Sequence, residues 1–145
     1  QHFPPFVLKD PRLCLTLPYW LPHFSPTPTI VLVARHPGAI AQSLYTRGAM
    51  PIEHGLSLWG FYMNQALKHT EGLNVVRVSY EALIEKSEAT VKMLHQRLVQ
   101  HTPKLNPLDK KDVNACIFSS LARETPNGVK LTATQQALYQ RVTGE

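Results

Sequence analysis

Apolar runs of strand length alternate along this chain with stretches in which apolar residues recur at helical spacing. The run Ile30–Ala34 is wholly aliphatic, as in a parallel strand that is covered on both faces. Shorter apolar stretches occur before and after it. We therefore predict strands over Phe6–Lys9, Thr29–Ala34 and Asn74–Ser79.

Helices are predicted between these strands from the apolar spacing and from the residues that start and stop helices. They cover Leu13–Leu21, Pro37–Thr46, His54–His69, Ser87–Val99, Lys111–Leu121 and Thr132–Val142. Pro18 is expected to kink or stop the first helix, and Gly48 to close the second. The alternation predicts a three-layer α/β fold, with a parallel sheet flanked by helices, in a single domain over residues 1–145.

The composition is that of an ordinary globular chain. Apolar residues make up 43% and charged residues 17% of the 145 positions, which argues against disorder. No apolar run approaches the roughly 18 residues of a spanning helix, so we expect no membrane contact. Cys14 and Cys116 stand alone, which favours reduced cysteines in a cytoplasmic protein. The histidines lack metal-ligand spacing, so we expect no metal site.

The net charge of +5 favours an anionic ligand or partner. The densest basic cluster, Lys104–Lys111, is interrupted by Pro107 and Asp109 and lacks interleaved aromatic residues. We favour a solvated loop there. A basic nucleic-acid-binding module is therefore the least favoured of the functions considered.

The residues around Arg35 are the best suited to binding an anion. Arg35 follows the aliphatic strand, and Pro37 then starts a helix. The backbone N–H groups of Gly38–Ile40, expected to be exposed at the positive end of this helix, would point toward an anion. Ser43 and Arg47 are four residues apart and share one face of the helix. Two guanidiniums and a hydroxyl suit a phosphate monoester better than a carboxylate.

This segment resembles the 3′-phosphate-binding region of the sulfotransferases, which use 3′-phosphoadenosine 5′-phosphosulfate (PAPS) as sulfuryl donor. The family pattern is a hydrophobic strand ending in Arg, often followed by Asp/His-Pro or Asp-Gly, and then a helix with Ser eight residues after the Arg. The matching residues here are Arg35, His36-Pro37 and Ser43. Two further segments match in the family's order. Val7–Arg12 resembles its Lys-Asp-Pro segment, and Val76–Ile84 its strand ending in Tyr-Glu-x-Leu. The likeness covers roughly residues 5 to 99 and is nearest to bacterial and tyrosylprotein sulfotransferases.

The resemblance implies a role for each of these residues. The 3′-phosphate end of PAPS, or of adenosine 3′,5′-bisphosphate, would be bound by Arg35, Ser43, Arg47 and Tyr80. Lys9 would be catalytic, because a cation beside the sulfonate stabilises its transfer. No general base is identified. The residues themselves leave a second interpretation of Tyr80 open, in which its ring covers the core.

The basic residues also have simpler interpretations. Arg35 could form an ion pair with Glu81 or Asp10, and Lys9 could form one with Asp10 or a neighbour. Arg47 could complement the dipole at the end of its helix. These alternatives stay open at the level of sequence.

The family's loop for the 5′-phosphosulfate, a P-loop variant after the first strand, has no counterpart in the sequence. Gly55 and Gly60 have the right spacing, but Phe61-Tyr62 follow them where Lys and Ser or Thr are required. We therefore expect an incomplete sulfotransferase fold, P-loop NTPase-like, that lacks the first strand and P-loop. We expect this chain to be inactive alone.

In a complete protein, such a domain would transfer a sulfuryl group to a hydroxyl or amine acceptor. The alternative is a non-catalytic remnant that binds a phosphonucleotide or acts as an interaction module. An exposed sheet edge could also pair two copies of the chain. The segment Arg123–Lys130 is similar to a basic loop that closes over the nucleotide in some members, although we favour a surface turn.

Overall fold

Two short parallel strands form the sheet of this protein. The computed structural model describes residues 6–102, 105–117 and 128–144. Strand β1 covers Ile30–Ala34 and strand β2 covers Val75–Ser79. They pair in parallel, with Ala34 opposite Ser79 at their carboxyl ends. Both lie where the sequence predicts them, because each contains β-branched aliphatic residues that favour a half-buried pleated surface.

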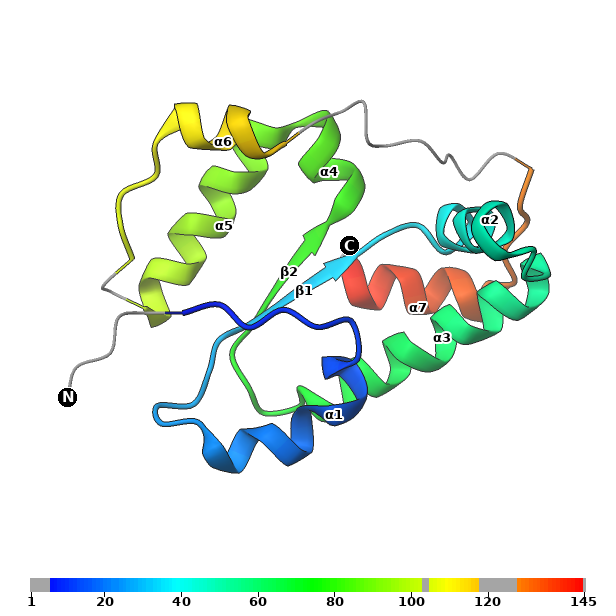
Figure 1. Ribbon diagram of the computed structural model, residues 1–145, viewed down its shortest axis with the longest axis horizontal. Helices are drawn as coiled ribbons and strands as arrows, with labels where there is room; N and C mark the ends of the chain where they lie inside the picture. Colours follow the sequence, from blue (N-terminus) through cyan, green and yellow to red (C-terminus); the bar gives the residue numbers. More distant parts are fainter. Residues whose placement is uncertain (1–5, 103–104, 118–127, 145) are drawn as a thin grey trace.

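Helices make up most of the described chain (Figure 1). In order they are α1 (Leu13–Trp20), the short 3₁₀ helix η1 (Leu21–His23), α2 (Pro37–Gly48), α3 (Ile52–His69), α4 (Tyr80–Glu85), α5 (Ser87–His101), α6 (Lys110–Cys116) and α7 (Ala133–Thr143). The structure is therefore mixed α/β, mostly helical, with a small parallel sheet. None of the described helices is both long and apolar enough to cross a membrane.

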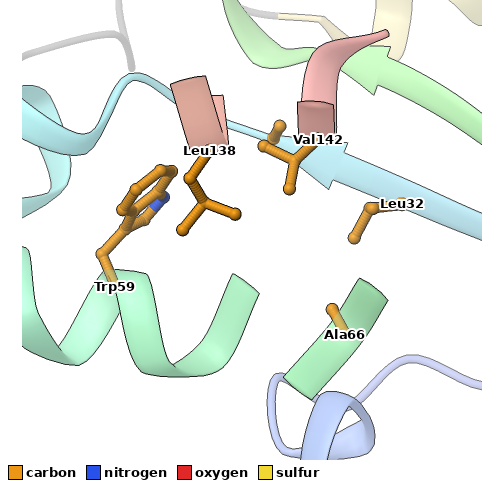
Figure 2. Close-up of a cluster of buried hydrophobic side chains, with 6 residues drawn as sticks. Leu32, Trp59, Ala66, Leu138 and Val142 are labelled. Carbon is orange, nitrogen blue, oxygen red and sulfur yellow. The ribbon is translucent and has the colours of Figure 1, made fainter. Parts of the chain in front are cut away.

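The hydrophobic core lies on one face of the sheet, where α7 and α3 pack (Figure 2). Its buried members are Leu32, Ala34, Trp59, Ala66, Leu138 and Val142. Trp59 and Ala66 are two helical turns apart, so both project from the same side of α3. Helix α7 packs against both strands and against α3, so the last helix of the chain closes a core that earlier elements begin.

Helices α4 and α5 cover the opposite face of the sheet only in part. Val76 and Val78 of β2 are buried there, and both helices pack against that strand. Val31 and Val33 lie opposite them in the register, on the same face, but are 40% and 48% exposed. The sheet is thus flanked by helices on both faces, although β1 stays open on one of them.

The predicted strand at Phe6–Lys9 is wrong. This segment has irregular backbone, and Phe6 and Val7 are 72% and 93% exposed. An apolar run becomes a strand only where a neighbouring strand takes its backbone hydrogen bonds, and no such partner lies beside it in the described part of the chain. The observed sheet therefore has the two strands named above in place of three.

The observed helices differ from the predicted ones mainly in the residues at which they begin and end. Helix α6 stops at Cys116 because Ile117 is extended, whereas we predicted a longer helix. Gly48 is the last residue of α2, and Ala49 adopts the left-handed conformation that ends it, with φ 52°. The sequence pattern does not predict α4, which starts directly after β2.

Candidate functional site

Parallel pairing brings the carboxyl ends of β1 and β2 side by side. Because Ala34 lies opposite Ser79, the next residues, Arg35 and Tyr80, leave the sheet at the same edge. The Arg35 guanidinium carbon lies 4.7 Å from the centroid of the Tyr80 ring, within range of a cation–π interaction. Both residues are half-buried. Ligands of α/β sheets bind at this kind of edge, so it is the candidate site.

The start of α2 differs from the predicted exposed anion cradle. Pro37, Gly38 and Ala39 are buried. His36 caps the helix, since its Nδ1 accepts a hydrogen bond of 3.1 Å from the Gly38 N–H. The Ile40 N–H donates to the His36 carbonyl at 3.1 Å. The prediction that these backbone N–H groups are exposed is therefore wrong, because the side chain and backbone of the preceding histidine satisfy two of them.

The pKa of His36 is lowered by its partial burial, an effect that the nearby negative charge of Glu81 opposes. A lowered pKa keeps the imidazole neutral. That state is required at the helix cap, because only an unprotonated Nδ1 can accept the hydrogen bond from Gly38.

Glu81 is the central hydrogen-bond acceptor of this edge. One carboxylate oxygen accepts from the His36 N–H at 2.8 Å. The other accepts from the Ser79 hydroxyl at 3.1 Å and from the Tyr139 hydroxyl at 3.2 Å. The Tyr139 ring also meets the His36 ring edge-on, with centroids 5.3 Å apart. The carboxylate therefore joins both strand ends to α7.

The sequence pattern includes Glu81 in the Tyr-Glu-x-Leu match and as a candidate ion-pair partner of Arg35, but it does not point to Tyr139. Glu81 directly follows Tyr80 after a predicted strand, and that position is a signal for the site. Tyr139 lies 58 residues further along the chain, and no spacing rule connects two positions so far apart. Only the packing of α7 on the sheet brings it there.

Ser43 and Arg47 lie further along α2, as predicted. The Arg47 Nε donates a hydrogen bond of 3.3 Å to the Ser43 carbonyl, and the Arg47 side chain is exposed. Ser43 is half-buried, and its hydroxyl forms no hydrogen bond within the described residues. Both polar groups are thus available to a ligand.

Lys9 does not lie at the end of a strand. It is exposed in the irregular segment before α1. Asp10 pairs with Arg12, not with Lys9, through a 2.8 Å ion pair at the surface. Hydrogen bonds from Arg12 lower the pKa of Asp10 to about 2. Neither the predicted catalytic position of Lys9 nor its alternative pairing with Asp10 is observed.

The predicted loop Arg123–Lys130 lies mostly outside the described residues, which resume at Gly128. Val129 packs closely against the start of α2. A Cβ added at Gly38 would lie only 3.1 Å from the Val129 Cβ. An open hollow of about 680 Å³ lies between this segment, α2 and α3, and Lys130 lines it. The end of the loop therefore does reach the helix that follows Arg35.

No protein-family model, curated protein or solved structure matches this chain. Within the described residues, no group of three or more His, Cys, Asp or Glu side chains is placed to hold a metal ion. Function is therefore inferred from the geometry of the carboxyl edge itself.

Proposed function

We propose that the carboxyl edge binds the 3′-phosphate end of PAPS or of adenosine 3′,5′-bisphosphate. The observation that supports this most directly is the position of Arg35 over Tyr80, where two parallel strands end beside α2. A half-buried guanidinium at such an edge suits a phosphate, since charge-assisted hydrogen bonds are stronger than neutral ones.

Side chains, more than backbone amides, would make the contacts to the phosphate. The N–H groups of Gly38 and Ile40 already have partners within the protein. Arg35 would supply the charge, and Ser43 and Arg47 would add hydrogen-bond donors from α2. The Tyr80 ring holds the guanidinium in place. Glu81 is a nearby negative charge, but three donors share its carboxylate.

In a protein that also supplies a 5′-phosphosulfate loop, this half-site would orient PAPS for transfer of its sulfuryl group to a hydroxyl or amine acceptor. Lys9 has no part in the proposal, because it lies exposed outside the sheet. The second candidate is a non-catalytic phosphonucleotide-binding module. The absence of a strand at Phe6–Lys9 favours it, because the region that resembles the family's Lys-Asp-Pro strand does not adopt that structure.

Calorimetry with two nucleotides tests the proposal. Adenosine 3′,5′-bisphosphate should bind more tightly than adenosine 5′-monophosphate, which lacks the 3′-phosphate. Arg35→Ala should weaken bisphosphate binding by about 1.5–3 kcal/mol and Ser43→Ala by less, because Arg35 brings a positive charge and several donors to the phosphate, whereas Ser43 brings one neutral hydroxyl.

Arg97→Ala is the matched control, since Arg97 is an exposed arginine on α5 and its loss should leave both affinities unchanged. Equal affinities of the wild-type chain for the two nucleotides would contradict a 3′-phosphate site. A loss with Arg97→Ala as large as that with Arg35→Ala would show that only net charge is being measured.

A further inference from the structure

A hollow lined by three cations lies away from the carboxyl edge, beside the turn that leads from α3 into β2. Its volume is about 510 Å³ and it is open to solvent. Its lining residues are Asn64, Leu67, Lys68, Thr70, Glu71, Gly72, Leu73, Val75, Arg77 and Arg141. None of them belongs to the candidate site described above. The two regions are therefore separate.

Arg77 is the unusual member of this hollow. It lies in the middle of β2, opposite Leu32, on the sheet face that carries the core. The end of α7 packs against its aliphatic stem, because a Cβ built on Gly144 would lie 3.4 Å from the Arg77 Cδ. Its Nε is buried and has no hydrogen-bond partner in the described part of the chain. A buried donor without a partner is costly, so an acceptor that bonds to the Arg77 Nε–H would stabilise this region.

The neighbouring charges do not supply that acceptor. Lys68 and Arg141 are the other cations of the hollow, and each lies in the last turn of its helix. Glu71 is the one acidic residue that lines it, and it forms no ion pair with any of the three cations. The hollow therefore gathers three positive charges against one negative charge.

Helix dipoles explain two of these cations but not the third. Lys68 and Arg141 complement the negative carboxyl ends of α3 and α7, as cations there commonly do. Arg77 lies inside a strand and has no dipole to complement. Its half-buried charge on the core face is the observation that points to a ligand.

We propose that this hollow binds a phosphate group, held by Arg77 with Arg141 and Lys68 around it. A guanidinium presents donors in a planar fork that matches phosphate oxygens, and an ammonium adds a point charge. The apolar side of the hollow, formed by Leu67, Leu73 and Val75, leaves room for the body of a phosphomonoester.

Nuclear magnetic resonance can test this on the whole chain. Inorganic phosphate is titrated at constant ionic strength, with chloride as the balancing anion, while backbone amides and arginine Nε–H groups are observed. The NMR signals of the Arg77 Nε–H and of the amides of residues 70–73 should shift as phosphate is added, and the shifts should reach saturation. Glycerol phosphate in a second titration distinguishes the sources, since tighter binding than inorganic phosphate would assign the site to a phosphomonoester.

The geometry predicts how substitutions of the arginines change the affinity for phosphate. Arg77→Gln should weaken phosphate binding at least tenfold, about 1.4 kcal/mol. Arg141→Gln should weaken it several-fold, because that side chain is exposed. Arg97→Gln on α5 is the control with equal loss of charge. Arg77→Lys keeps the charge, and should bind more weakly than the wild type but more tightly than Arg77→Gln.

Two results would overturn the proposal, and the first needs no variant. In the first, phosphate shifts only the NMR signals of residues around Arg35 and Ser43 in the wild-type chain, or shifts the signals of residues 70–73 no more than chloride does. Alternatively, Arg77→Gln, Arg77→Lys and Arg97→Gln could all bind phosphate equally. Either result would leave Arg77 as a structural residue.

Discussion

At the scale of single residues, Glu81 determines what the carboxyl edge can do. Its carboxylate accepts hydrogen bonds from a backbone N–H before α2, from a hydroxyl at the end of β2 and from a hydroxyl on α7. Hydrogen bonds to an ionised group are worth roughly 1.5–3 kcal/mol each, so this carboxylate fixes the geometry of both strand ends. Arg35 is thereby held where a ligand could meet it without a large rearrangement.

His36 makes the stability of this edge depend on pH. Its pKa is lowered in the folded protein, so the unfolded chain binds more protons in the range between that lowered value and the ordinary 6.5. Stability therefore rises with pH through this range, and is lost as the pH falls below about 6.5. Protonation also removes the acceptor for the Gly38 N–H.

His36→Asn tests this assignment, because asparagine can still cap the helix but does not titrate. Urea unfolding between pH 5 and pH 7.5 should show a smaller loss of stability on acidification for the variant than for the wild type. His54→Asn, at an exposed position of α3, controls for the loss of one imidazole. Equal slopes for wild type and His36→Asn would contradict a lowered pKa of His36 in the folded protein.

At the scale of elements, α7 contributes more to the core for its length than the longer helix α3 does. It supplies Leu138 and Val142 to the buried cluster and Tyr139 to the carboxyl edge. Its start is fixed by a capping box. The Thr132 hydroxyl accepts from the Gln135 N–H at 3.2 Å, and the Gln135 side chain accepts from the Thr132 N–H at 2.9 Å.

Thr132→Ala should therefore destabilise the whole protein by about 1 kcal/mol, the usual cost of losing an N-cap side chain. Thr134→Ala is the matched control. Thr134 is an exposed residue inside the same helix, where alanine is the better helix former, so no loss is expected. Urea unfolding of the two variants measures the difference. If both variants were equally stable, the cap would be no more than a local contact of a frayed helix end.

Local signals in the sequence predicted the elements well. The aliphatic runs of β1 and β2, the Pro that starts α2 and the apolar stripe of α3 each lie within one stretch of chain. The strand at Phe6–Lys9 failed for the opposite reason. Its apolar residues fit a strand, but a strand also needs a neighbour, and that is a property of the tertiary structure.

The candidate site was predictable only where the two predicted strands determine it. The meeting of Arg35 and Tyr80 follows from two predicted parallel strands, which end at the same edge. The buried start of α2 did not follow, because it depends on Val129 and Tyr139 packing there from the far end of the chain. Contacts between such distant residues have no periodicity for a sequence pattern to show.

At the scale of the whole molecule, the two candidate anion sites lie at separate places on the small sheet. Tyr80 and the Arg35 guanidinium lie after the carboxyl end of β2, and Arg77 lies within it beside the cationic hollow. The cations at the two candidate anion sites therefore form two small, separate groups rather than a continuous track. A polynucleotide, which needs an extended track of cations, is therefore a poorer fit than small phosphorylated ligands.

The last prediction concerns catalysis by the chain of 145 residues alone: it should transfer no sulfate from PAPS at a measurable rate. The reacting group of PAPS hangs from its 5′-phosphate, and no segment of this sequence has the pattern of a loop that would hold it. Binding at the 3′-phosphate alone leaves the reactive end free to move. Orientation of reacting groups can supply roughly 7–11 kcal/mol of a lowered barrier, so its loss is decisive.

The measurement is a radiolabelled PAPS assay against phenols, sugars and amines, with a known active sulfotransferase as positive control for each acceptor. Lys9 gives no reason to expect rescue, because it is exposed and outside the sheet. Turnover that disappears with Arg35→Ala but persists with Arg97→Ala would contradict the prediction. It would mean that side chains at the carboxyl edge orient the sulfuryl group directly, and that a separate 5′-phosphosulfate loop is not required.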